Sequence, residues 1–168
     1  MKDPGTAVLS PCGTYRYRLE RDVGMDGPVF AFFGVNPSIA DATINDQTVG
    51  KWIGFVKRWG GRRFIVGNVF AYRATDVREL RAVQQPVGPD NFAHLERIAA
   101  DADVLVPCWG DRTKVPRSLH HHIDKTLAFL LTLGKPVRAF GFSKRGDPLH
   151  PLMLGYDTKL VPCESEAA

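Results

Sequence analysis

Four polar or aromatic side chains, Asn36, Asn68, Trp109 and His150, lie at or beyond the ends of apolar runs in this chain. An amide can hold a water molecule or read a hydrogen-bonding edge, and an imidazole can donate to an atom that gains negative charge. Ligands of open α/β sheets bind at the carboxyl ends of the strands. We therefore expect these side chains to line one cleft at such an edge.

The segment Gly34-Val35-Asn36-Pro37-Ser38 is the most informative of these places. Gly34 allows a ligand or another chain segment to approach the backbone closely. Pro37 fixes its own φ and keeps Asn36 out of helical geometry, so the amide is held in one direction. We expect Gly34, Pro37 and Ser38 to bind substrate and Asn36 to be catalytic. Asn-Pro also occurs in ordinary turns, which leaves a structural role open.

Two carboxylates follow this segment and are candidates to assist Asn36. An Asn can hold a water molecule but cannot take its proton at neutral pH, so a nearby carboxylate would help. Asp41 is expected to be catalytic, and Asp46 is the second candidate. A turn residue and a helix cap are the alternative roles for these two side chains.

Apolar runs and helical periodicities alternate along the chain, which predicts the elements that position these residues. Strands are expected over 29–35, 64–70, 103–108 and 136–142, and alternation of Tyr15, Tyr17 and Leu19 with charged residues predicts an edge strand over about 14–20. Helices are expected over about 46–59, 91–102 and 117–133. The pattern predicts one α/β domain over residues 1–168, with its core over about 28–162. We expect a three-layer α/β/α sandwich with a mainly parallel central sheet.

The charge balance permits a polyanionic partner. The formal net charge of the 168 residues is +4, and the basic loop after the last predicted strand holds Lys144 and Arg145. We expect these two side chains to contact nucleic-acid phosphates. Tyr72 and Arg73 are expected to meet a base or a phosphate by stacking and charge, with a structural pair of loop residues as the alternative.

Other features argue against cofactors, metals and membranes. The three cysteines, Cys12, Cys108 and Cys163, are too dispersed for a disulfide framework, a Cys-x-x-Cys site or an iron–sulfur cluster. His120, His121 and His122 are consecutive on a predicted helix and cannot all face one metal ion. No segment has the length of an apolar membrane span. We expect a cytoplasmic protein without cofactor or metal; oligomeric state stays open.

Longer motifs resemble a known family. Gly-Val-Asn-Pro-Ser-Ile-Ala-Asp-Ala from Gly34, Gly-Asn-Val-Phe-Ala-Tyr-Arg-Ala-Thr-Asp from Gly67, Trp109-Gly110 and His150-Pro151-Leu152 look like domain-of-unknown-function family 1643. The likeness covers roughly Val29 to Pro162. That family name carries no activity.

The same order of motifs also looks like that of the uracil-DNA glycosylase superfamily. This resemblance implies that Asn36 orients the attacking water, Asn68 reads a flipped base and His150 stabilises the departing base anion. It also implies that Leu154 is the wedge that fills the vacated stack, and that Trp109 contributes to the substrate site. The pattern departs from that superfamily at Leu152, where a Ser would follow His-Pro, and in lacking an aromatic residue soon after Pro37.

These observations lead to an expected function. Cleavage of an N-glycosidic bond develops positive charge on the sugar and negative charge on the base, so it requires an aligned water and a donor at the base. We expect a DNA-glycosylase-like hydrolase acting on a flipped or modified base in nucleic acid, with DNA implied by the resemblance. The alternatives are an enzyme acting on a free nucleoside or nucleotide and a noncatalytic nucleic-acid-binding module.

Overall fold

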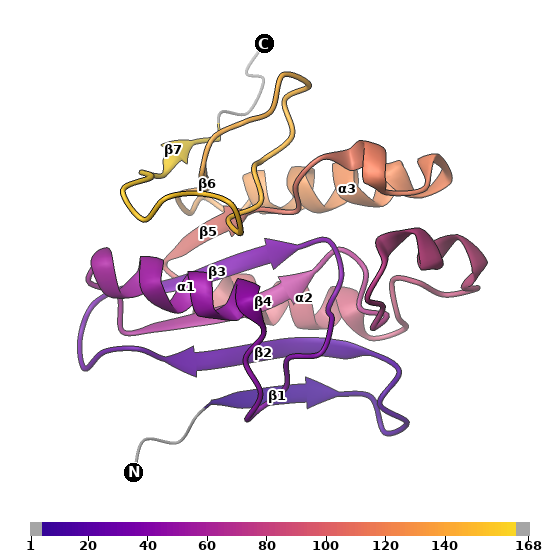
Figure 1. Ribbon diagram of the computed structural model, residues 1–168, viewed down its shortest axis with the longest axis horizontal. Coiled ribbons are helices and arrows are strands. Elements are labelled where there is room, and N and C mark those ends of the chain that lie inside the picture. The colour runs from indigo at the N-terminus through magenta and orange to yellow at the C-terminus, as the bar shows by residue number, and fades with distance from the viewer. Residues whose placement is uncertain (1–4, 164–168) are drawn as a thin grey trace.

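A five-stranded mixed sheet forms the centre of the fold (Figure 1). The structure is a computed structural model that describes residues 5–163. The strand order is β1-β2-β4-β3-β5. The strands are β1 (Thr6–Leu9), β2 (Arg16–Asp22), β3 (Val29–Gly34), β4 (Arg63–Asn68) and β5 (Val104–Pro107).

Strand β3 lies in the middle of the parallel part of this sheet. It pairs with β4 on one side and β5 on the other, and Phe33 is in register with Gly67 and with Pro107. All six residues of β3 are buried, as expected of a strand that is covered on both faces. The carboxyl ends of the three parallel strands therefore meet at one edge, directly before Val35, Val69 and Cys108.

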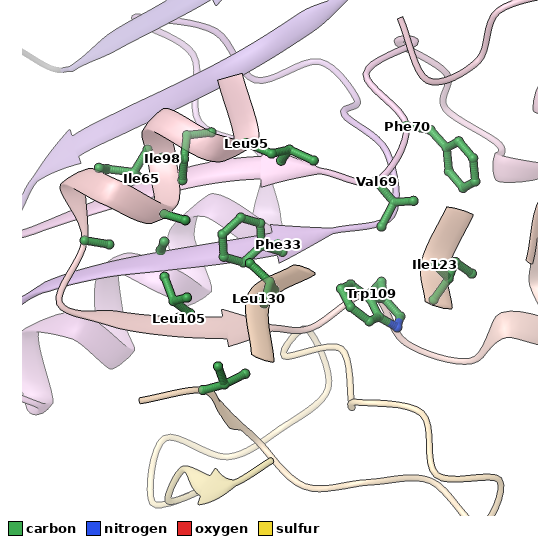
Figure 2. Close-up of a cluster of buried hydrophobic side chains, with 14 of the residues drawn as sticks. Phe33, Ile65, Val69, Phe70, Leu95, Ile98, Leu105, Trp109, Ile123 and Leu130 are labelled. Carbon is green, nitrogen blue, oxygen red and sulfur yellow. The ribbon is translucent and has the colours of Figure 1, made fainter. Parts of the chain in front are cut away.

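Helices cover the two faces of the sheet because successive residues of β3 point to opposite sides. Phe30 and Phe32 pack in a cluster with α1 (Gln47–Arg58), which begins at the cap residue Asp46. Ala31 and Phe33 pack in a second cluster with α2 (Asn91–Asp101) and α3 (His120–Leu131), shown in Figure 2.

Three short 3₁₀ helices and a small second sheet complete the described elements. The 3₁₀ helices are η1 (Val77–Ala82), η2 (Arg112–Lys114) and η3 (Arg117–Leu119). Strands β6 (Arg138–Ala139) and β7 (Val161–Pro162) pair antiparallel to each other.

The α/β class is confirmed, whereas the predicted three-layer sandwich with a mainly parallel sheet is not. Within the main sheet, the pairings of β1 with β2 and of β2 with β4 are antiparallel. The predicted edge strand is β2, and it lies inside the sheet because β1 covers its outer side. The predicted strand over 136–142 contributes only the bridge between Leu105 and Val137 to the main sheet. Its next residues pair with β7 instead.

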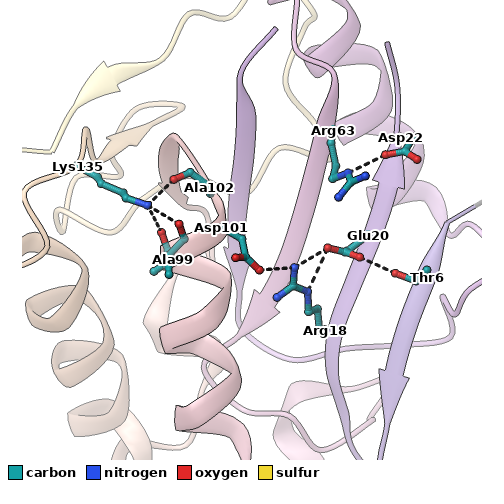
Figure 3. Close-up of polar contacts among 10 residues, drawn as sticks. Thr6, Arg18, Glu20, Asp22, Arg63, Ala99, Asp101, Ala102 and Lys135 are labelled. Carbon is teal, nitrogen blue, oxygen red and sulfur yellow. Dashed lines mark hydrogen bonds and ion pairs between the residues drawn. The ribbon is translucent and has the colours of Figure 1, made fainter. Parts of the chain in front are cut away.

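Charged side chains connect the antiparallel strands to the rest of the molecule (Figure 3). Arg18 of β2 donates to Glu20 and to Asp101 at the end of α2, and Thr6 of β1 donates to Glu20. Lys135 donates to the carbonyl oxygens of Ala99, Ala100 and Ala102, where the backbone acceptors of a helix end lack helical partners. These contacts tie β1, β2, α2 and the segment after α3 together.

The aromatic cluster under α1 should carry a large share of the stability. Phe32 is fully buried, and its ring stacks on Trp52 and on Phe140 with centroid distances of 5.1 and 6.2 Å. Phe32→Ala should lower the free energy of unfolding by about 3–5 kcal/mol, measured by urea denaturation. Met25→Ala, at a side chain that is 88% exposed, should change it by less than about 0.5 kcal/mol. Equal effects of the two substitutions would contradict this packing.

Candidate functional site

A small polar cavity of about 80 Å³ lies at the carboxyl ends of the parallel strands. The predicted substrate-binding residues Gly34, Ser38 and Asn68 line it, together with the predicted catalytic residues Asn36 and His150. The structure thus brings together residues that follow different strands. The complete lining consists of Arg16, Gly34, Val35, Asn36, Ser38, Asp46, Thr48, Trp52, Asn68 and His150.

The backbone holds the side chain of Asn36 in one orientation. Its Nδ2 donates to the carbonyl oxygen of Ala74 at 2.7 Å and to that of Pro37 at 3.1 Å. The amide nitrogen is committed to the chain, which leaves Oδ1 as the atom of this side chain that can meet a ligand. An oxygen in this position can accept a hydrogen bond from a water molecule.

Asn68 differs from Asn36 in that its amide nitrogen has no hydrogen-bond partner. The residue is 3% exposed, and its Nδ2 is buried without a hydrogen-bond partner. A Cβ atom added at Gly34 would lie 2.8 Å from Asn68 Oδ1. A larger residue at position 34 would therefore clash with the Asn68 amide in its present position. Gly34 therefore acts by making room for Asn68.

Arg16 is a buried cation in the cavity that sequence reasoning missed. It is 3% exposed; its Nη1 donates to Ala40 O at 2.9 Å, while its Nε has no partner. Burial lowers the pKa of Arg16 to about 10, and Asp46 opposes that shift. Arg16 therefore places a buried positive charge in the lining of the cavity, and its Nε is a donor without a partner.

Trp52 is a second hydrogen-bond donor among the residues that line the cavity. It is 5% exposed, and its Nε1 lacks a hydrogen-bonded oxygen or nitrogen partner. The buried thiol of Cys108 lies beside it: burial raises the pKa of Cys108 to about 12, and the nearby Trp52 opposes that rise. Because sulfur is a weak acceptor, the indole N–H stays available to a better one.

The alternating pattern of β2 did not reveal Arg16 as a site residue. Alternation in β2 assigns Arg16 to the face opposite Tyr17, where solvent is the simplest expectation. Because β2 runs antiparallel to β4, the start of β2 lies beside the carboxyl end of β4. The side chain of Arg16 is therefore directed into the functional edge.

His150 is a partly buried imidazole whose proton position follows from its contacts. Its Nδ1 accepts a hydrogen bond from Leu152 N at 3.2 Å, so the neutral ring carries its proton on Nε2. Burial lowers the pKa of His150 below the ordinary value of 6.5, Lys114 adds to this shift, and Asp46 opposes it. The ring is consequently a neutral donor at pH 7.

A buried ion pair fixes the loop that carries His150. Asp147 is 2% exposed, and its carboxylate accepts hydrogen bonds from the backbone N and the Nε of Arg112, at 3.0 and 2.9 Å. Close to this pair, Gly110 N donates to Pro148 O at 2.9 Å. The loop after β6 is thereby held against the segment after β5.

Several predicted site residues lie outside the cavity lining. Trp109 is buried in the core beside Ile123 (Figure 2). The carboxylate of Asp41 accepts hydrogen bonds from Thr43 N and Ile44 N, as a turn residue does. Pro37 is buried next to the cavity, and its carbonyl accepts from Asn36.

The remaining predicted contacts are spread over neighbouring surfaces. Arg73 lines a separate hollow with Ser38, and Tyr72 packs against Tyr15. Leu154 is partly buried against the aromatic cluster, whereas its neighbour Met153 is 91% exposed. Lys144 is exposed, and Arg145 lines a separate cleft together with Arg112 and Lys114.

The described residues give no indication of a metal centre or a membrane segment. Within residues 5–163, no three His, Cys, Asp or Glu side chains are grouped in a way that would hold a metal ion. None of the helices in this range has the length and apolar character needed to span a bilayer.

Comparison with known proteins identifies the family. The model of the protein family of unknown function DUF1643 matches residues 16–152. The chain belongs to the DUF1643 family. The matched range runs from Arg16 to Leu152 and includes every residue that lines the cavity. No curated protein and no solved structure shows significant similarity to the chain.

The environment of His150 makes its titration testable. Its ring carbons, followed by NMR as the pH changes, should give a pKa below 6.5. Lys114→Gln should raise that pKa, because it removes a positive charge that disfavours the imidazolium ion. Lys144→Gln is the matched control and should leave it unchanged. A wild-type pKa at or above 6.5 would contradict a buried, neutral His150.

Proposed function

We propose that the cavity receives the base of a nucleotide within a nucleic acid and that the protein hydrolyses its N-glycosidic bond. The observation that carries this proposal is the convergence of Asn36, Asn68 and His150 on one cavity with unpartnered donors. These are the side chains for which the glycosylase resemblance implies water, base and leaving-group roles. The helices on both faces of the sheet also support the finer proposal of a glycosylase-like α/β/α sandwich.

The unpartnered donors favour a base that carries carbonyl oxygens. Among the buried side-chain atoms without a partner in the described residues, Arg16 Nε, Trp52 Nε1 and Asn68 Nδ2 belong to residues lining this cavity. Each buried donor left unpaired costs about 1–3 kcal/mol. A ligand that supplies acceptor oxygens removes part of that cost, so carbonyl-bearing bases should bind in preference to bases without them.

The size of the cavity favours a polynucleotide over a free nucleoside or nucleotide. Sites that enclose small molecules usually measure roughly 300–1,000 Å³, whereas this cavity measures about 80 Å³. It suits a base, or the edge of one, whose sugar and phosphates remain outside. A base inside a stacked strand reaches such a site only after it is rotated out of the stack. Met153, which is 91% exposed beside Leu154, is one apolar side chain that we propose to fill the gap.

The proposed reaction assigns one role to each side of the scissile bond. As the bond between the sugar carbon and the base nitrogen breaks, its electron pair stays with the base. His150 Nε2–H then donates to the base oxygen that gains charge. Because His150 is neutral, it stabilises this anion by a hydrogen bond without a full positive charge.

Water attacks the sugar carbon on the opposite side. Asn36 Oδ1 accepts a hydrogen bond from this water and aligns it, but cannot remove its proton. Asp46 also lines the cavity, and we assign the removal of that proton to its carboxylate. One oxygen of Asp46 accepts from Val49 N at 2.9 Å as the helix cap, which leaves the other for the water. Asp46 therefore replaces Asp41 as the proposed base.

Activity should depend on His150 in a defined way. Oligonucleotides carrying uracil, mismatched or modified bases are incubated with the protein, and alkali-labile sites are counted. His150→Ala should reduce the single-turnover rate by roughly a hundredfold, as loss of an oxyanion donor does, while oligonucleotide binding survives. His121→Ala, at an exposed ring, is the matched control and should keep the wild-type rate.

Asn36→Asp completes the test because it keeps the size of the side chain but replaces the Nδ2 that donates to Ala74 O and Pro37 O by a carboxylate oxygen, which cannot donate. Its single-turnover rate should fall below that of the wild type, because the carboxylate faces two carbonyl oxygens and the side chain is no longer held with Oδ1 toward the water. If wild-type and Asn36→Asp proteins both leave every oligonucleotide intact, the hydrolase proposal fails. Oligonucleotide binding without cleavage would then identify a noncatalytic module.

A further inference from the structure

We propose that a cationic cleft beside the cavity binds the phosphates of a nucleic-acid backbone and guides the strand to His150. In naming the partner of that site, this inference rests on the proposed function. The cleft has a volume of about 630 Å³. We call this hollow the basic cleft. It is lined by Arg78, Arg81, Arg112, Thr113, Lys114, Val115, Pro116, Arg117, His120 and Arg145.

Three separate segments supply the positive charges of the basic cleft. Helix η1 contributes Arg78 and Arg81, the segment from η2 to η3 contributes Arg112, Lys114 and Arg117, and the loop after β6 contributes Arg145. Segments far apart in the sequence thus place their guanidinium and ammonium groups around one hollow. Two of these segments are joined by the same ion pair, Arg112 with Asp147, that fixes His150.

Four of the six arginine and lysine side chains that line the basic cleft form no ion pair within the described residues. Arg112 pairs with Asp124 and Asp147, and Arg78 pairs with Asp76. No acidic residue lines the cleft within the described range. Asp111 is an opposing charge nearby, and Arg145 and Lys114 make a minor contribution to the lowering of its pKa. A polyanion would relieve the remaining repulsion. The cleft cations that form no ion pair in the described part of the chain are Arg81, Lys114, Arg117 and Arg145.

The basic cleft is electrostatically and physically linked to the catalytic cavity. Lys114 in the cleft contributes to the lowered pKa of His150, which places the two groups within electrostatic reach. The loop from Ser143 to His150 supplies Arg145 to the cleft and His150 to the cavity, and Asp147 between them is buried on Arg112. Phosphates held in the cleft would therefore keep the sugar of a neighbouring nucleotide beside His150.

The residues that line the basic cleft favour a nucleic-acid backbone over a free nucleotide as the ligand. Apart from the imidazole of His120, no aromatic ring among the described lining residues offers a base a surface for stacking. Contacts to phosphate alone position a nucleic acid without reading its sequence. Charges distributed over three segments suit phosphates that recur along a strand better than the compact cluster of one nucleotide.

The test measures binding of a fluorescent single-stranded oligonucleotide with unmodified bases, by anisotropy at several salt concentrations. The variant Arg81→Gln/Lys114→Gln/Arg117→Gln removes three charges from the cleft. The control Lys57→Gln/Arg62→Gln/Arg138→Gln removes three exposed charges elsewhere. The cleft variant should bind at least about tenfold more weakly at low salt, and its salt slope should fall by roughly 0.7 for each lost phosphate contact. The control should change both values much less.

Three results would overturn the proposal: no binding by the wild type, equal weakening in both triple variants, or full displacement of the oligonucleotide by equimolar ATP. The last would assign the cleft to a free nucleotide. Binding of unmodified strands needs no hydrolysis, so the outcome is independent of the glycosylase assay. Cleft-dependent binding without cleavage would reject only the hydrolase, and cleavage that is unaffected in the cleft variant would reject only the cleft.

Discussion

Parallel pairing of β3 with β4 and β5 is the constraint on which the site depends. It brings three strand ends to one edge, so the side chains that follow them must share a small space. Asn36 and Asn68 meet there although a helix and a complete strand separate them along the chain. The aromatic packing beneath α1 stabilises this arrangement and brings the cap residue Asp46 to the same edge. The reactive groups are thus brought together by strand pairing.

Buried hydrogen-bond donors without partners, which lower the stability of the folded state, occur at this edge. Protein interiors pair nearly all their buried polar groups, yet Arg16, Trp52 and Asn68 each keep a buried donor atom without a partner. Residues around them are held firmly: Asn36 by backbone carbonyls, and the His150 loop by the Asp147 ion pair. Rigid surroundings with unpaired donors are expected of a site organised in advance for a ligand.

Local patterns in the sequence predicted most helices and strands, but predicted the pairing of the strands less well. The apolar run before Asn36 and the helix after Asp46 appear nearly where periodicity puts them, because burial and capping are local. The strand expected over 136–142 joins the main sheet only through the bridge between Leu105 and Val137, and β1 was missed, because pairing depends on distant residues. Arg16 escaped notice for the same reason: its place at the functional edge follows from antiparallel pairing of β2 with β4. Family membership could be predicted because it rests on several motifs in order.

The most direct measurement of the central claim is an NMR titration of the donors themselves. The Trp52 Nε1–H and Asn68 Nδ2 resonances are followed while the protein is titrated with free uracil, hypoxanthine or xanthine, which carry ring carbonyl oxygens, and with adenine, which carries none. At least one carbonyl base should shift both resonances through a saturable transition, and adenine should shift neither. Unmoved resonances with every base, or equal shifts with adenine, would contradict a cavity built to receive a carbonyl-bearing base.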